Sequence, residues 1–123
     1  MLGTVDAAAA LADLTDISPQ IRRVVVVDAA GVVVGSNAPD GAAAGRLAER
    51  GLHLAAEADQ VRGDHVSQLE AATGEGSVFV VRDGGRTIVA TTRPEPTVGL
   101  VFYDLKTALR SIDEEASKGD GTA

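Results

Sequence analysis

The feature that most constrains the fold is a pair of valine runs, Val24–Val27 and Val32–Val34, joined by only four residues. The connection, Asp-Ala-Ala-Gly, places Asp28 and Gly31 at the first and fourth positions of a type I turn, which prefers these residue types there. Glycine can also adopt the positive φ that closes such a loop, so we predict a β-hairpin. A sheet with one face in water alternates polar and apolar residues. Uninterrupted valine therefore indicates that both faces of this hairpin are covered.

The length and composition predict one globular domain with an aliphatic core. A chain of 123 residues has the usual size of a single domain. We assign residues 1–116 to this domain and residues 117–123 to a disordered C-terminal tail. Aromatic residues make up only 2% of the chain, so aliphatic side chains must fill the core. The aromatic platforms on which single-stranded nucleic acid stacks are correspondingly scarce.

Charge and cysteine content exclude several classes of function. The net charge of −7 argues against nucleic acid and anionic membranes as partners, because an acidic surface releases no counterions from them. The absence of cysteine excludes disulfide scaffolds, thiolate catalysis and zinc–sulfur sites. The N-terminus does not resemble a secretion signal, and no apolar run approaches the ~20 residues of a membrane span. The sequence therefore predicts a cytoplasmic protein without membrane insertion.

Three segments have helical periodicity. The first is Thr4–Ile17, with Thr4 as its N-cap and an apolar stripe of Leu11, Leu14 and Ile17. The second is Gly41–Arg62, with Asp40 as N-cap and Gly63 as C-cap. Its predicted buried stripe consists of Leu47, Gly51, Leu54, Ala58 and Val61. The third runs from Val98 to about Ala116, is capped by Thr97 and buries Val98, Val101, Leu105, Ala108 and Ile112.

Three further strands are predicted between the second and third helices. His65–Ala72 has few strong apolar residues and is predicted to be an edge strand. Ser77–Arg82 and Thr87–Thr92 flank a glycine-rich hairpin turn, and Gly74–Gly76 makes another tight connection. The order of elements predicts an α/β (α+β) three-layer sandwich. A central five-stranded antiparallel sheet carries two helices on one face and the middle helix on the other.

This order, together with the hairpin, resembles the roadblock (dynein light chain) family, which shares its sandwich with longin and profilin-like folds. The resemblance covers about Leu11 to Ile112 and is strongest in the hairpin, where Gly31, Ser36 and Asn37 match the family pattern. It implies a non-enzymatic homodimer that binds or regulates a Ras-like small GTPase. Bacterial members similar to mutual gliding protein B stimulate GTP hydrolysis by such a partner, and other members are scaffolds.

The predicted sites follow from the edge strand and from this resemblance. An unpaired edge invites a second chain, and a two-fold axis lets the strand pair with its own copy; the family forms a ten-stranded sheet in this way. The predicted dimer interface is His65, Val66, Ser67, Gln68, Leu69, Glu70 and Ala71, with Gly45 and Gly51 permitting close helix packing. The predicted partner-binding residues are Arg46, Glu49, Arg50, His53, Glu57 and Gln60. Asp28, Gly31, Ser36 and Asn37 are predicted to have structural roles in the turn.

The sequence contains no recognisable catalytic, metal or cofactor motif. The glycine-rich segment before Val78 lacks the lysine of a phosphate-binding loop, and His53 and His65 lack metal-ligand spacing. Ser36 and Ser77 lack the elbow of a hydrolase nucleophile. We therefore predict no enzyme activity and no cofactor. A profilin-like sensory or ligand-binding module and a scaffold subunit of a signalling complex remain alternatives, and the sequence leaves open whether a GTPase is accelerated, recruited or scaffolded.

Overall fold

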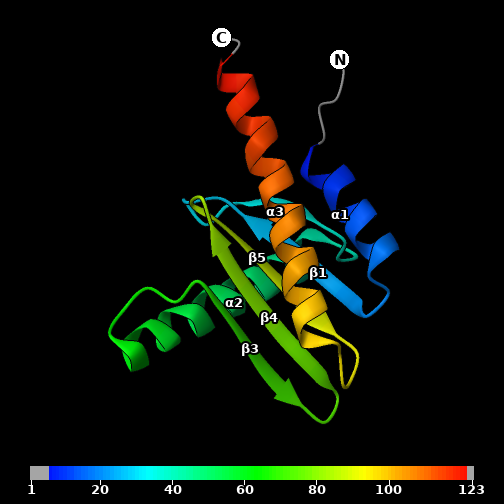
Figure 1. Ribbon diagram of the computed structural model, residues 1–123, viewed down its shortest axis with the longest axis vertical. Coiled ribbons are helices and arrows are strands. Elements are labelled where there is room, and N and C mark those ends of the chain that lie inside the picture. The colour runs from blue at the N-terminus through cyan, green and yellow to red at the C-terminus, as the bar shows by residue number, and fades with distance from the viewer. Residues whose placement is uncertain (1–5, 122–123) are drawn as a thin grey trace.

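The computed structural model describes residues 6–121, with side chains described as far as Ile112. Its elements in chain order are α1 (Ala7–Ile17), β1 (Ile21–Val27), β2 (Val33–Ser36), α2 (Gly41–Arg62), β3 (Gln68–Thr73), β4 (Gly76–Asp83), β5 (Arg86–Thr92) and α3 (Val98–Gly121). The strands form one five-stranded sheet in the order β2-β1-β5-β4-β3, and every neighbouring pair is antiparallel. Helices α1 and α3 cover one face and α2 lies on the other (Figure 1). The predicted three-layer fold is confirmed.

The face covered by α1 and α3 holds the larger side chains. Leu11 and Leu14 of α1 and Leu105 and Leu109 of α3 are almost completely buried against the sheet. Phe79 on β4 meets Phe102 edge-on, with the ring centroids 5.0 Å apart. The predicted burial of Ile17 is wrong, because this residue ends α1 and is 66% exposed.

The face covered by α2 is packed through small residues. Ala44, Ala48, Gly51 and Ala55 are the buried residues of α2. This corrects the predicted stripe: Leu47, Leu54 and Ala58 are only partly buried, and Val61 is 86% exposed. The helix is rotated so that its smallest residues face the sheet. At Gly51 an added Cβ would overlap the methyl carbons of Val89, so glycine is needed for this close approach.

The first hairpin has one covered strand and one exposed strand. Val24–Val27 in β1 are completely buried, as the uninterrupted run predicts. The second run differs, because Val32, Val33 and Val34 are all exposed. Strand β2 lies at the edge of the sheet and therefore has a neighbouring strand on one side only. The expectation that both valine runs are covered on both faces is wrong for this strand.

The turn and the end of the hairpin are held by side chains as well as backbone. The Asp28 side chain accepts hydrogen bonds from the backbone N–H groups of Ala30 and Val32, and Gly31 has a φ of +83°. Beyond β2, Asn37 accepts from the N–H of Val24 and donates to the carbonyl of Arg22. The Ser36 hydroxyl donates to the carbonyl of Val24. These polar side chains continue the pairing of β1 where the backbone ladder of β2 stops.

The ends of several elements differ from the predicted limits. The N-cap of α1 is Asp6, whose side chain accepts from the N–H of Ala9; Thr4, the predicted cap, lies outside the described residues. Both ends of α2 are as predicted, with Asp40 as N-cap and Gly63 in the left-handed conformation. Strand β3 begins at Gln68 rather than His65. Helix α3 continues past Ala116 to Gly121, into residues that the sequence assigned to the tail.

Candidate protein-interaction surface

The outer side of α2 carries a continuous row of charged and polar side chains. All of the residues predicted to bind a partner are exposed on this side: Arg46, Glu49, Arg50, His53, Glu57 and Gln60. The imidazole of His53 lies 3.8 Å from the Glu57 carboxylate, but both side chains are more than half exposed. A pair in this position contributes little to stability. The row is therefore free to make contacts outside the monomer.

Strand β3 forms the edge of the sheet nearest the C-terminal half of α2 (Figure 1). Its backbone pairs with β4 from Gln68 opposite Val81 to Thr73 opposite Gly76. Within the described residues no strand pairs with its other side. Leu69 packs against the cluster beneath α2, and Glu70 accepts a hydrogen bond from Ser77 on β4. The strand is thus fixed to the sheet on one side and open on the other.

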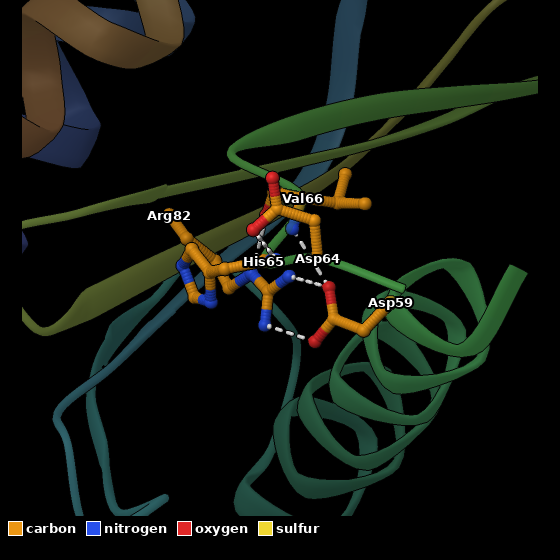
Figure 2. A network of polar contacts seen from close by, with 5 residues as sticks. All are labelled: Asp59, Asp64, His65, Val66 and Arg82. Carbon is orange, nitrogen blue, oxygen red and sulfur yellow. Dashed lines mark hydrogen bonds and ion pairs between the residues drawn. The ribbon is translucent and has the colours of Figure 1, made fainter. Parts of the chain in front are cut away.

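The remaining residues of the predicted dimer interface, His65, Val66 and Ser67, lie in the loop between α2 and β3. Arg82 on β4 holds this loop: its Nε donates to the carbonyl of Val66 over 2.8 Å, and its backbone N–H donates to the carbonyl of Ser67. Figure 2 shows the guanidinium group directed at Asp59 on α2, with which it forms two hydrogen bonds of 2.5 and 3.2 Å. One arginine therefore links the end of α2, the loop and β4.

The Asp59 carboxylate completes this network. It also accepts a hydrogen bond of 2.7 Å from the backbone N–H of Val66. The paired hydrogen bonds from Arg82, and then the bond from Val66, lower the pKa of Asp59 below its ordinary value, because both favour the charged form. Two parallel charge-assisted bonds also fix the geometry of the two groups. The network thus joins the C-terminal end of α2 to the loop that precedes β3.

Sequence reasoning identified neither Asp59 nor Arg82. The two residues are 23 positions apart and belong to different elements. No motif spacing joins them, and each resembles an ordinary charged residue at the end of a helix or strand. Asp59 is the one acidic residue of α2 that is only partly exposed, and a carboxylate that approaches a sheet needs a cationic partner.

The two glycines of the predicted interface have different surroundings. Gly45 is exposed, and a Cβ added there would meet nothing within 4 Å. Gly51 is buried inside the monomer against Val89. The prediction that Gly51 contributes to contact between two chains is therefore wrong, because the sheet of its own chain occupies this position.

A groove of about 610 Å³ opens at one end of the sheet, between the β1–β2 and β4–β5 turns. Asp28, Gly84 and Gly85 come from the turns, while Leu52 and His65 close the side nearest α2. Charges of both signs line it, and the Asp28 carboxylate is already bonded to its own turn. Among the residues that the structure describes, no group of three histidine, aspartate or glutamate side chains is arranged to hold a metal ion.

Solved structures of other proteins have the same fold. No protein-family model and no curated protein sequence matches the chain. A Roadblock/LC7 domain from Streptomyces avermitilis superposes with a TM-score of 0.74 at 17% identity, covering 86% of this chain and 93% of that one. The chain therefore has the Roadblock/LC7 fold, as the resemblance predicted.

Gliding proteins named MglB have the same fold. MglB from Thermus thermophilus superposes with a TM-score of 0.75 at 17% identity, over 96% of this chain and 95% of that one. An MglB described in a tetrameric arrangement gives a TM-score of 0.69 at 16% identity, covering 96% and 94%. Among the described residues, no helix combines the length and apolar character needed to cross a membrane.

Proposed function

We propose that this protein is a non-enzymatic interaction module that forms a homodimer and regulates or scaffolds a Ras-like small GTPase. The observation that carries the proposal is the exposed mixed-charge row on α2 beside an open sheet edge, in a chain with the Roadblock/LC7 fold. Two points support this role: gliding proteins named MglB have the same fold, and the hairpin resembles that of a family whose members bind or regulate such GTPases. In its more specific form, the proposal is that this protein accelerates GTP hydrolysis by the GTPase.

The proposed dimer pairs β3 of one chain with β3 of another across a two-fold axis. Open N–H and C=O groups on this edge gain partners when an identical strand lies antiparallel to it. Leu69 and Val66 are partly buried in the monomer and would lose further surface to water. The loop held by Arg82 supplies the start of the interface, so its geometry is fixed before the second chain binds. Sedimentation giving only the monomer mass at tens of micromolar would contradict this dimer.

The proposed docking surface for the GTPase is the outer row of the two α2 helices, which pairing of the sheets brings to the same face. Arg50 and His53 lie at the centre of each row, with acidic residues on both sides. Interleaved charges of both signs suit a mixed-charge partner surface, where complementarity determines specificity and the association rate more than affinity. In this proposal the GTPase supplies its own catalytic groups, and binding of this protein repositions them.

The deciding experiment is capture from a lysate of the native organism, with and without a non-hydrolysable GTP analogue. Enrichment of a Ras-like GTPase that depends on the nucleotide supports the proposal. Purified partner and protein are then combined in a GTP hydrolysis assay, which separates acceleration from recruitment. Absence of any GTPase in either capture would overturn the proposed function.

The isolated protein is expected to neither bind nor hydrolyse nucleotide. The chain lacks a lysine-bearing phosphate loop, and no described group of acidic residues is arranged to hold magnesium. Titration calorimetry with GTP and ATP tests this. Micromolar affinity for either nucleotide would instead favour a ligand-binding module, with the groove of about 610 Å³ at the hairpin turns as its site.

A further inference from the structure

Strand β2 forms the edge of the sheet opposite β3, and within the described residues no strand pairs with its outer side. The strand and the residue before it are apolar, because Val32, Val33 and Val34 are 57%, 36% and 38% exposed. No charged residue occurs between Ala29 and Pro39. Exposed edge strands of soluble proteins commonly carry charges that prevent pairing with other chains. The edge of β2 instead combines open backbone groups with uncovered apolar side chains.

The open edge of β2 is short. Its register against β1 shifts between Val26 and Val27, and Val34 has no partner on β1 in the described pairing. A bulge of this kind bends an edge strand and limits continuous pairing. On the side of α1, Gly35 lies so close to Ala7 that an added Cβ would overlap it. The available edge therefore suits a short extended segment better than the edge of a second sheet.

Two arginines lie on β1 just beyond the end of β2. The Asn37 side chain, which follows β2, accepts from the N–H of Val24 and donates to the carbonyl of Arg22. Arg22 and Arg23 are both exposed. Neither side chain has a hydrogen-bond or ion-pair partner among residues 6–112, although the chain contains 18 acidic and 11 basic residues. One end of the β2 edge is therefore positively charged in an acidic protein.

These two features together indicate what binds at the edge. A strand placed against β2 pairs its backbone with the open groups and covers the valines with its own apolar side chains. Beyond the end of β2, such a strand lies about two strand spacings, or roughly 10 Å, from β1. An arginine side chain on β1 can reach a carboxylate at that position. A second copy of this chain satisfies only the first feature, because its own β2 edge carries no carboxylate between Ala29 and Pro39.

We propose that the outer edge of β2 binds a short extended segment of a partner protein, with β-branched residues beside Val33 and Val34 and an acidic residue at one end that meets Arg22 or Arg23. Hydrogen bonds between the two main chains contribute affinity, while the side chains and the terminal charge determine which segment binds and in which direction. The site uses neither β3 nor the outer row of α2, so it does not depend on the proposed dimer or GTPase surface. A dimer formed through β3 leaves both of its β2 edges open.

The test begins with a phage-displayed library of linear dodecapeptides, selected on the whole protein after depletion on the Val33→Lys variant. Lysine at an exposed edge position opposes strand pairing. Thermal melting followed by circular dichroism checks that this variant is folded, and Val32→Lys, at a more exposed position, replaces it if it is not. The expected products contain a run of β-branched residues with aspartate or glutamate at one end. Failure to enrich such peptides would overturn the proposal.

Binding of a labelled selected peptide is then measured by fluorescence anisotropy. Val33→Lys is expected to weaken binding by about 10-fold or more. Val61→Lys, the same change at the exposed end of α2, is expected to leave binding within about twofold. The double change Arg22→Gln with Arg23→Gln should weaken binding of the acidic peptide by about 5-fold and leave a version with amide side chains unaffected. Equal weakening by the two lysine variants, or an equal effect of the double change on both peptides, would contradict the proposed site.

Hydrogen–deuterium exchange locates the bound peptide without any variant. The selected peptide is expected to slow exchange of backbone N–H groups in residues 32–37 and to leave residues 68–73 of β3 unchanged. Slower exchange in β3 instead would place the peptide at the other edge, and the proposal would be wrong. Sedimentation of wild type and Val33→Lys at equal concentration tests a second copy as the occupant. An assembly larger than a dimer that only wild type forms would show that a second copy, rather than a partner segment, binds this edge.

Discussion

The two faces of the sheet are packed in opposite ways. Between the sheet and the α1/α3 layer lie large side chains, including Phe79, Leu14 and Leu105. Between the sheet and α2 lie mainly valines on one side and alanines with Gly51 on the other. The first arrangement buries much apolar surface per residue and therefore contributes most of the stability. The second brings a helix close to the sheet and leaves its charged row exposed, which suits a surface used for contacts.

The largest expected effect is truncation of a large side chain on the α1/α3 face. Phe79→Ala removes a completely buried ring that contacts Phe102. We expect the free energy of unfolding to fall by about 3–5 kcal/mol, from lost burial and the cavity left behind. Urea denaturation followed by circular dichroism measures this loss. If Val80→Ala, on the opposite side of the same strand, costs as much, the contrast between the two faces is incorrect.

The next effect tests close packing on the α2 face. Gly51→Ala adds a Cβ that meets the stiff, buried side chain of Val89, so we expect a loss of about 1–3 kcal/mol from overpacking. Gly45→Ala is the matched control, because its Cβ points into open space on the same helix. Alanine's better helix propensity should make this control stabilise the protein by up to about 1 kcal/mol. Thermal melts of both variants that shift in the same direction would contradict the close approach of α2.

Helix α2 also shows which features of the structure could be predicted from the sequence and which could not. The limits of α2 were predictable, because Asp40 and Gly63 are local signals that act on their own backbone. Which side of α2 is buried was not, because leucine and alanine both belong to its apolar half. Periodicity favoured the leucines, whereas the distance between helix and sheet selected the alanines and Gly51.

The candidate sites also differ in whether they could be predicted from the sequence. The exposed row on α2 could be predicted, since charged residues at helical spacing face water whichever apolar side is buried. The Asp59–Arg82 pair could not, because it depends on how α2 and β4 meet in space. Strand β2 was misjudged for a related reason: a run of valines reports β-propensity but not a strand's place in the sheet.

A smaller effect is expected at the exposed row of α2, and it concerns binding rather than folding. The double change Arg50→Glu with His53→Glu lies on the outer side of the helix and should alter stability by less than about 0.5 kcal/mol. Binding of the GTPase identified by capture should weaken by about 1–2 kcal/mol, the scale of a modest interface anchor. Surface plasmon resonance measures this, with sedimentation as the check on the dimer. Unchanged GTPase binding would mean that the partner docks elsewhere.

The smallest expected effect is a pH dependence that arises at the end of α2. Hydrogen bonds from Arg82 and Val66 hold the pKa of Asp59 below its value in the unfolded chain. The folded state therefore binds this proton less readily. The contribution of the Asp59 carboxylate to the free energy of unfolding is complete above the pKa of Asp59 in the unfolded chain. It is lost as the pH falls through the lowered pKa of Asp59 in the folded protein. In the Asp59→Asn variant, this part of the loss of stability at acid pH should be absent. In the Asp64→Asn variant, which changes an exposed residue of the adjoining loop, it should remain.

Denaturation of wild type and both variants between neutral pH and the acid limit of folding measures the difference. Because the Asp59 and Arg82 side chains are 29% and 16% exposed, solvent weakens their attraction and the effect should be smaller than those at Phe79 and Gly51. The same network positions the loop before β3, so Asp59→Asn should also weaken dimerisation in sedimentation experiments at neutral pH. If Asp59→Asn and Asp64→Asn give the same pH profile and the same association, the network does not couple α2 to the edge of the sheet.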